Sequence, residues 1–499
     1  MEMQFDKIPV AHLQKLTVQL RSQEQTQEVR LPDGMPDIGH VLGSWGQVIV
    51  RGKEWNGDHM AVACGVMVWV LYTPEDGEGV RSVDAWLPFS FKWDLPDTRH
   101  DGKILISCWL KHVDARSTSA RKLMVRANLE ALGEAWQPGN GELPVAEELP
   151  DDVYLLKNTY PVMLPREAGE KAFVLEEQVT LPTNFPKPEK LMYYSLQPEI
   201  AEQKMMAGKL VFRGNGLLHI LYRGQDGKLY TYDCDLPFSQ YAELEGEYDQ
   251  DASASLYPCV TSLDVMPGED GTLQLKAGLL GQYLLSDRTM LTVPEDVYSP
   301  YRPVQPATEQ LVLPTVLDRT VQTLHGEQTL QADVAQLVDV VFNSAYEQPE
   351  RTDAGFAMPV SGRFQILYYD PEGMLCSASA PWEEIWELDA AHDSIPDART
   401  YPMGRPQAVT GAGSVTLRAD VQTDAVTWAG QGICAVSGME MGEPAKPDPN
   451  RPSLILCRKG NRSLWDVAKA TGSTVEKIMQ ANGLDTEADD NAVLLIPVC

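Results

Sequence analysis

The sequence predicts a mainly β fold: three tandem β-rich domains, sandwich-like or open-barrel in form, followed by a small βααβ domain. Two observations carry this prediction. One apolar strand that ends in a glycine turn is written three times along the 499 residues. In the last part of the chain, short helical patterns replace the strands. The length of the chain also favours several domains, because a chain of this size needs more than one hydrophobic core.

The repeated strand is an apolar run that passes into a turn. It occurs as VWVLYTPEDG (Val68–Gly77), LHILYRGQDG (Leu218–Gly227) and FQILYYDPEG (Phe364–Gly373). Tyr72 and Tyr222 are 150 residues apart, and Tyr368 follows 146 residues later. A glycine after a β-branched and aromatic run favours a hairpin, because glycine accepts positive φ at low cost. The pattern therefore predicts the same hairpin in three copies.

Further markers recur in the same order. LPDGMPDI (Leu31–Ile38) is matched by LPTNFPKP (Leu181–Pro188), and LPFS at Leu87–Ser90 recurs at Leu236–Ser239, with APWE at Ala380–Glu383 in the third copy. A downstream strand shares one alternating pattern as VRANL (Val125–Leu129), LKAGL (Leu275–Leu279) and LRADV (Leu417–Val421). Such alternation indicates a strand with one buried face.

These markers and the proline-rich joints set the expected domain bounds. Joints are expected at Ser299–Pro306 and Gly442–Pro452. The predicted units are residues 1–165 (first repeat with an N-terminal extension), 166–305 (second repeat), 306–442 (third repeat), 443–452 (linker) and 453–499 (terminal domain).

The terminal domain reads as strand, helix, helix, strand. Ser463 is a good N-cap for the first helix, and Gly472 ends it. Thr474 caps a second helix that closes at Asn482-Gly483. A final apolar strand, AVLLIP, follows. The order β-α-α-β is therefore expected within about fifty residues.

Charge and composition exclude several classes of function. The formal net charge is −30, which disfavours nucleic acid and anionic membrane surfaces as partners. No run approaches the ~20 apolar residues of a membrane span, and the start has no basic region followed by an apolar one. We expect the chain to stay in the cytosol. The eight cysteines, Cys457 and Cys499 included, are dispersed without CxxC, so free thiols are expected.

Catalytic and metal motifs are missing from the sequence. The eight histidines form neither HxH nor HExxH, and GxSxG, P-loop and GxGxxG patterns do not occur. His219 takes the place of Trp69 and Gln365 in the other copies, which indicates a structural position. We therefore expect no enzyme activity, no catalytic residue, no metal and no cofactor.

The tail resembles a LysM domain. It carries Gly460, Leu464-Trp465 and Val467-Ala468, then Thr474, Ile478 and Asn482, and finally Leu495-Ile496-Pro497 in the positions of that family's framework. Two loops depart from the family pattern. GNRS (Gly460–Ser463) replaces GDT, and DDNAV (Asp489–Val493) replaces PGQ. In carbohydrate-binding members these loops contact N-acetylglucosamine, so the departures disfavour sugar binding.

The repeats resemble SPOCS domains, which are β domains of proteins made during endospore formation. LPDGMPDIGHVL, VLYTPEDGEGVRSVDAWLPFS and SARKLMVRANL (Ser119–Leu129) carry this resemblance. SPOCS repeats that end in LysM are similar to a clostridial family of coat-morphogenesis proteins. That resemblance implies a scaffold of spore coat assembly in the mother cell, at the forespore surface. It also implies a tail that binds a coat ATPase of the SpoIVA type, with other coat proteins as further partners.

The candidate partner-binding residues lie in two loops of the tail. They are Lys459, Gly460, Asn461, Arg462, Ser463, Leu464, Trp465, Asn482, Gly483, Leu484 and Asp485. Two alternatives remain open. One is an envelope protein that binds peptidoglycan or chito-oligosaccharide through LysM. The other is a hydrolase with a LysM targeting tail, for which the sequence offers no candidate catalytic residues.

Overall fold

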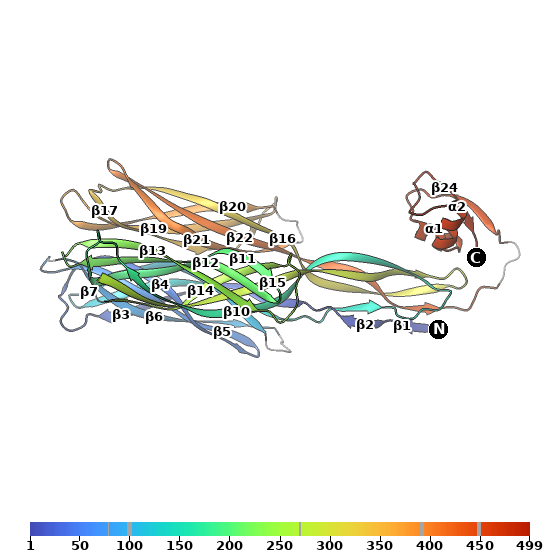
Figure 1. Cartoon of the computed structure of the whole chain (residues 1–499), viewed down its shortest axis with the longest axis horizontal. Coiled ribbons are helices and arrows are strands. Elements are labelled where there is room, and N and C mark those ends of the chain that lie inside the picture. Colours follow the sequence, from blue (N-terminus) through green and yellow to red (C-terminus); the bar gives the residue numbers. More distant parts are fainter. Residues whose placement is uncertain (78, 97–101, 269–270, 390–393, 447–450) are drawn as a thin grey trace.

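The computed structural model describes residues 1–77, 79–96, 102–268, 271–389, 394–446 and 451–499. It confirms the mainly β fold with a small βααβ domain at the end (Figure 1). Residues 447–450 of the predicted linker lie outside the described part. None of the helices in the described ranges is long and apolar enough to cross a membrane.

Each repeat is a sandwich of two antiparallel sheets, which have three strands each in the first two repeats and an added short strand each in the third. In the first repeat one sheet has the order β3-β8-β7 and the other β4-β5-β6. Its strands are β3 (Leu13–Arg30), β4 (Ile38–Asn56), β5 (His59–Pro74), β6 (Arg81–Asp94), β7 (Lys103–Ser119) and β8 (Lys122–Pro138). The first strand thus pairs with the last, and the repeated hairpin forms the middle and edge of the second sheet.

The second and third repeats follow the same strand order. The second has β10 (Tyr154–Thr180), β11 (Pro188–Met206), β12 (Lys209–Gly224), β13 (Leu229–Glu243), β14 (Ser253–Pro267) and β15 (Thr272–Tyr298). The third has β16 (Val304–Gln331), β17 (Gln336–Tyr346), β19 (Phe356–Tyr369), β20 (Leu375–Leu388), β21 (Ile395–Thr410) and β22 (Ser414–Met441), with a short β18 (Glu350–Arg351) beside β19. The boundaries between repeats that were predicted at residues 165–166 and 305–306 lie inside strands β10 and β16.

The tyrosine of the repeated hairpin braces its own sandwich. Tyr72 donates a hydrogen bond of 3.0 Å to the carbonyl of Pro36, and Tyr222 donates one of 3.1 Å to Pro186. Both prolines belong to the repeated LP loop that joins the two sheets. In the third repeat this loop is only residues 332–335 and has no proline. The hydroxyl of Tyr368 accordingly has no hydrogen-bond partner among the described residues.

The leucine before each tyrosine joins the three repeats together. Leu71, Leu221 and Leu367 are each 0% exposed and belong to one apolar cluster built from all three copies. Successive side chains of a strand point to opposite faces. The Leu-Tyr pair therefore puts the tyrosine on its own sandwich and the leucine against the other repeats.

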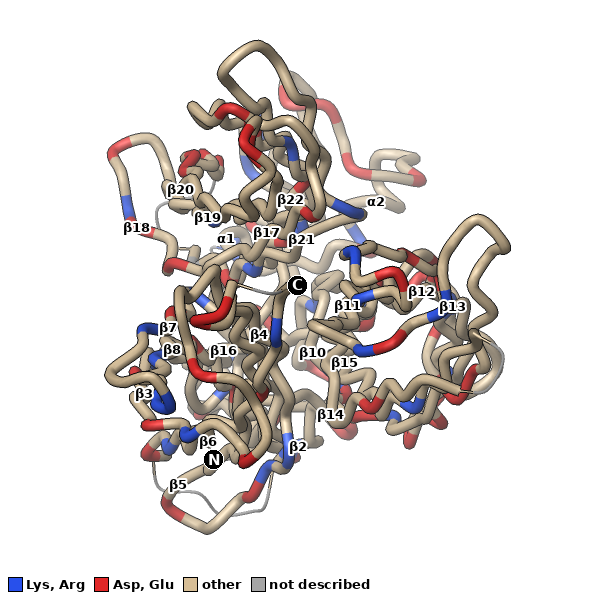
Figure 2. The backbone as a smooth tube through the Cα atoms, turned by 90° about the vertical axis from the view of Figure 1, so that its left-hand side faces the viewer, with Lys and Arg blue, Asp and Glu red and all other residues tan. Residues whose placement is uncertain are grey.

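Contacts between the repeats run in one cyclic direction. Leu132, Gln282 and Asp424 occupy the same position of the repeated downstream strand. Leu132 of the first repeat packs in the core of the third. Gln282 of the second donates to the Ile106 carbonyl of the first at 2.9 Å. Asp424 of the third holds Arg319, which donates to the Ala254 carbonyl of the second. The three lobes in Figure 2 are therefore arranged around an approximate threefold axis.

One buried cation touches all three repeats. Arg399 on β21 is paired with Glu134 of β8 and donates to the hydroxyl of Ser107 at 3.2 Å. Its guanidinium lies 3.7 Å from the ring centre of Tyr257 on β14, a cation–π contact. Removing one partner of such a buried pair leaves an uncompensated charge, so this contact fixes how the repeats sit together.

Beyond the lobes, three two-stranded ribbons continue into a stem. The stem is made of the outer ends of β10–β15 and β16–β22 together with β2 (Asp6–Pro9) and β9 (Glu142–Val145) (Figure 1). Where the stem begins, the strand pairs β3–β8, β10–β15 and β16–β22 each have an extra residue at the same place, namely Leu16, Arg166 and Leu317. Apolar residues of all three ribbons form the stem core. The first strand, β1 (Glu2–Gln4), pairs with β22, so the N-terminus is attached to the third repeat.

His219 carries a buried charge between the second and third repeats. Its ring lies 2.8 Å from Asp233 and 3.1 Å from Asp339, a carboxylate of β17. Burial disfavours the charge, but the two carboxylates outweigh burial and raise the pKa of His219 to about 10. The structural role that the sequence indicated for this residue thus becomes an ionic contact between two repeats.

We expect Tyr222→Phe to lower the free energy of unfolding by about 1 kcal/mol, because it removes the hydrogen bond to Pro186. Tyr368→Phe is the matched control and should change it by much less. Urea unfolding of both variants measures the difference. Equal losses in the two variants would contradict the bracing role.

We expect the stabilising effect of His219 to depend on pH. A folded-state pKa above that of the unfolded chain gives a contribution that is complete below about pH 6.5 and shrinks towards pH 10. His219→Gln should therefore destabilise the protein strongly at pH 6 and much less at pH 10. Urea titrations of wild type and variant at both pH values test this. A loss that is the same at both would show that His219 is neutral in the fold.

Candidate functional site

The C-terminal module confirms the predicted βααβ order. It consists of β23 (Leu454–Arg458), α1 (Leu464–Thr471), α2 (Val475–Asn482) and β24 (Val493–Pro497). Helix α1 starts with a capping box, in which Ser463 accepts from the Asp466 N–H while the Asp466 carboxylate accepts from the Ser463 N–H. Both helices end on glycines in the left-handed conformation. The module is therefore built by local signals that the sequence shows directly.

The two basic residues of the first loop, Lys459 and Arg462, bond to groups of the module itself. Lys459 is 5% exposed, and its Nζ lies 3.0 Å from Asp490 and 3.7 Å from Glu487 in the second loop. The hydrogen bond that Lys459 donates to Asp490 raises the pKa of Lys459. Arg462 turns back and donates to the carbonyls of Lys459 and Arg458. These cations tie the two loops to the module and leave little free positive charge for a partner.

Several other predicted site residues build the fold of the module. Leu464 is in its core. Asn482 donates to the carbonyls of Ile478 and Leu495 and accepts from the Leu495 N–H at 2.8 Å, so it joins α2 to β24. Gly460 and Gly483 have φ of 60°, a conformation that favours glycine.

The remaining members of the predicted set differ in exposure. Leu484 packs against the module core. Ser463 forms the cap of α1. Six members of the set are exposed: Gly460, Asn461, Arg462, Ser463, Gly483 and Asp485. Within this set, Asn461 and Asp485 are the two exposed side chains for which the structure shows no role inside the module.

Trp465 lies against the stem. Its indole Nε1 donates to Asp296 of β15 at 2.8 Å, and its ring meets the ring of Tyr298 edge-on, with centres 4.7 Å apart. Lys469, one turn along α1, forms an ion pair of 2.7 Å with the same Asp296. Tyr298 also donates to the Ser473 carbonyl at 3.0 Å. The module thus docks on the end of the β10–β15 ribbon, and Trp465 is central to that contact.

Sequence reasoning missed Asp296, as it missed Tyr298 and Lys469 of the same contact. Asp296 follows the strand pattern of β15 in an acidic stretch, PEDVY, and nothing local distinguishes it from the many other acidic residues. Partial burial opposes its charge, but hydrogen bonds from Lys469, Trp465 and the Val297 N–H outweigh burial and hold its pKa below the usual range. An ionised Asp296 is therefore favoured by docking.

The described residues offer no group of three or more His, Cys, Asp or Glu side chains that could hold a metal ion. All eight cysteines are free thiols. A hydrogen bond with Cys64 and burial raise the pKa of Cys108, and burial raises that of Cys259. Raised values keep these thiols neutral and poorly nucleophilic.

Comparison with known proteins identifies one of the repeats. Residues 188–266 match the family model described as SipL, SPOCS domain. This span starts at the first residue of β11 and ends near the end of β14, so it lies within the second repeat. The second repeat is therefore similar to a SPOCS domain, and the other two repeats share its strand order. No curated protein and no solved structure matches the chain.

We expect Asp296→Asn to loosen the docked module. The variant loses the ion pair with Lys469, and charged hydrogen bonds of this kind contribute about 1.5 kcal/mol, or about a tenfold change in an equilibrium. Hydrogen exchange over residues 464–473 and 290–298 should increase together. Asp485→Asn, an exposed change in the same module, is the control and should leave exchange unchanged. Unaltered exchange in Asp296→Asn would contradict the docked arrangement.

Proposed function

We propose that this chain is a non-enzymatic scaffold of endospore coat assembly that acts in the mother cell at the forespore surface. The observation that carries the proposal is the SPOCS match at residues 188–266, in a chain that repeats the same strand order three times. The three repeats, which we call the body, are joined to one another through buried contacts. A rigid body of this kind is suited to holding partners in place. Other coat proteins are candidate partners of that body.

The tail is the part that we propose binds a coat ATPase of the SpoIVA type. Its βααβ order and its framework residues support assignment as a LysM domain. It lies near the end of the stem, away from the lobes (Figure 1). Asn461 and Asp485 are exposed there, and a protein partner can contact both without disturbing the module.

The second candidate function is binding of peptidoglycan or chito-oligosaccharide by the same tail. The LysM-like framework favours it. The first loop argues against it, since Lys459 is engaged by Asp490 and Glu487 of the opposite loop. Those ion pairs join the two loops that would have to receive a sugar.

The partner proposal predicts that the double variant Asn461→Arg/Asp485→Arg binds a SpoIVA-type ATPase at least about tenfold more weakly than wild type. Two arginines at the contact introduce bulk and unpaired positive charge, and a resulting loss of about 2 kcal/mol is more than tenfold in affinity. Titration calorimetry with the full-length chain measures the change. Glu476→Arg/Gln480→Arg, on the exposed face of α2, is the matched control with the same kind of added charge.

Two outcomes would overturn this assignment. One is full binding by a chain that ends at residue 446, which would place the partner site on the body. The other is heat of binding with a hexamer of N-acetylglucosamine that the loop variant abolishes, which would assign the tail to glycan. Asp296→Asn refines a positive result: tighter binding would mean that the partner uses the docked face of Trp465.

A further inference from the structure

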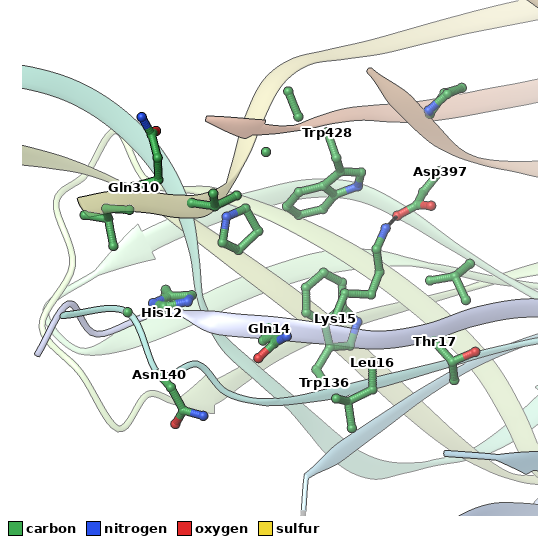
Figure 3. A pocket seen from close by; sticks show the side chains of 18 of the residues that line it. His12, Gln14, Lys15, Leu16, Thr17, Trp136, Asn140, Gln310, Asp397 and Trp428 are labelled. Atoms are coloured by element: carbon green, nitrogen blue, oxygen red, sulfur yellow. Dashed lines mark hydrogen bonds and ion pairs between the residues drawn. The ribbon is translucent and has the colours of Figure 1, made fainter. Parts of the chain in front are cut away.

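A cavity of about 960 Å3 lies between the first and third repeats, where their ribbons leave the lobes for the stem (Figure 3). Its walls come from β3 on one side and from β16 and β22 on the other. The extra residues Leu16 and Leu317 mark the bend of these two ribbons at the same level. The cavity is thus a product of how two copies of one repeat meet.

The edge of a strand borders this cavity. Residues on one face of a strand alternate along the sequence, so a cavity over a single face is lined by every second residue. Here the lining includes the continuous runs 14–18 of β3 and 309–312 of β16. Among the described strands, β3 pairs only with β8 and β16 only with β22. Both runs therefore belong to edge strands, and the extra residue Leu16 adds to the first.

The β3 edge is the better template for pairing. Strand β16 contains Pro306 and Pro314, which have no N–H to donate, whereas β3 contains no proline. An exposed edge presents unpaired N–H and C=O groups to an incoming chain. Lys15, which could shield the edge, is turned instead to Asp397, with its Nζ 5.0 Å from the ring centre of Trp428.

Trp428 supplies an unsatisfied donor in this cavity. Its side chain lines the cavity, the residue is 7% exposed, and its Nε1 has no hydrogen-bond partner among the described residues. A buried N–H without an acceptor costs about 1–3 kcal/mol. A bound carbonyl oxygen would remove that cost, so the indole points to a ligand that carries acceptors.

The charges of the cavity wall nearly cancel. Lys7 is paired with Glu309 at 2.6 Å, and Lys15 is paired with Asp397. Glu142 is the further charged residue of the wall. Trp136, Trp428 and Leu311 supply apolar surface between these pairs. A ligand that fits such a wall has little net charge and at least one apolar group.

We propose that this cavity binds an extended, nearly uncharged segment of a partner polypeptide by strand addition to the free edge of β3. Main-chain hydrogen bonds to residues 14–18 hold the segment, and an apolar side chain packs on Trp136 and Trp428. A carbonyl of the segment accepts from the Trp428 indole. Edge pairing gives affinity and the side-chain contacts give specificity. This site is independent of whatever the tail binds.

The test begins with selection of random twelve-residue peptides displayed on phage against the full-length chain. Peptides that are enriched are synthesised, and their affinity is measured by titration calorimetry. Gln14→Trp fills the cavity from an exposed position of β3 and should weaken binding at least tenfold. Gln19→Trp, the same change on the same strand outside the cavity, is the control and should leave affinity unchanged. Trp428→Phe, which removes the indole donor and part of the apolar ring surface, should weaken binding at least fivefold.

Methylation of single peptide nitrogens supplies the readout specific to strand addition. Because every second residue of a strand bonds to a given neighbour, methylation should abolish binding at alternate positions and be tolerated between them. The proposal is overturned if no peptide is enriched, if Gln14→Trp binds as well as wild type, or if methylation shows no alternation. It is also overturned if no peptide binds but a hexamer of N-acetylglucosamine does, and Gln14→Trp abolishes the binding of that hexamer. Thermal melting confirms that each variant is folded.

Discussion

Each repeated hairpin carries two adjacent large side chains that point to opposite faces of one strand, and the fold depends on burying both. Tyr222 finds its place inside its own sandwich, against the LP loop. Leu221 does not, because it faces outward from that sandwich into the cluster at the axis. A lone repeat would expose this leucine to water at a cost of about 2 kcal/mol. The three copies therefore form one structural unit, and the cyclic contacts at Gln282 and Asp424 lie between the copies of that unit.

Local patterns predicted the strands, the three copies and the helices of the tail, because turn glycines, alternation and helix caps act over a few residues. The arrangement of the copies could not be predicted in this way. Leu132, Gln282 and Asp424 occupy one position of the repeat but are apolar, amide and acidic. Each of the three side chains has a different neighbour, so the residue type at this position shows no common pattern. The stem was missed for the same reason: its core draws a few residues from each of three distant ribbons.

The tail shows why a family framework predicts a fold better than it predicts a site. Leu464, Asn482 and Gly460 match that framework, and all three hold the module together. Trp465 matches it too, yet it contacts Asp296 and Tyr298 of the stem, which only the folded chain brings near. The two exposed members of the predicted set without a role inside the module are Asn461, in the segment GNRS that departs from the family pattern, and Asp485, four residues before the other departing segment.

The cyclic direction of the contacts between repeats has a consequence for assembly. A head-to-tail interface gives a ring when its rotation closes and an open filament when it does not. Here the three copies lie on one chain, and the third contacts the second while the first contacts the third. The ring is complete within a single molecule, so each of these faces is already occupied by another repeat and cannot bind a second chain. Growth of any larger assembly must therefore start from the outside of the lobes, from the stem or from the tail.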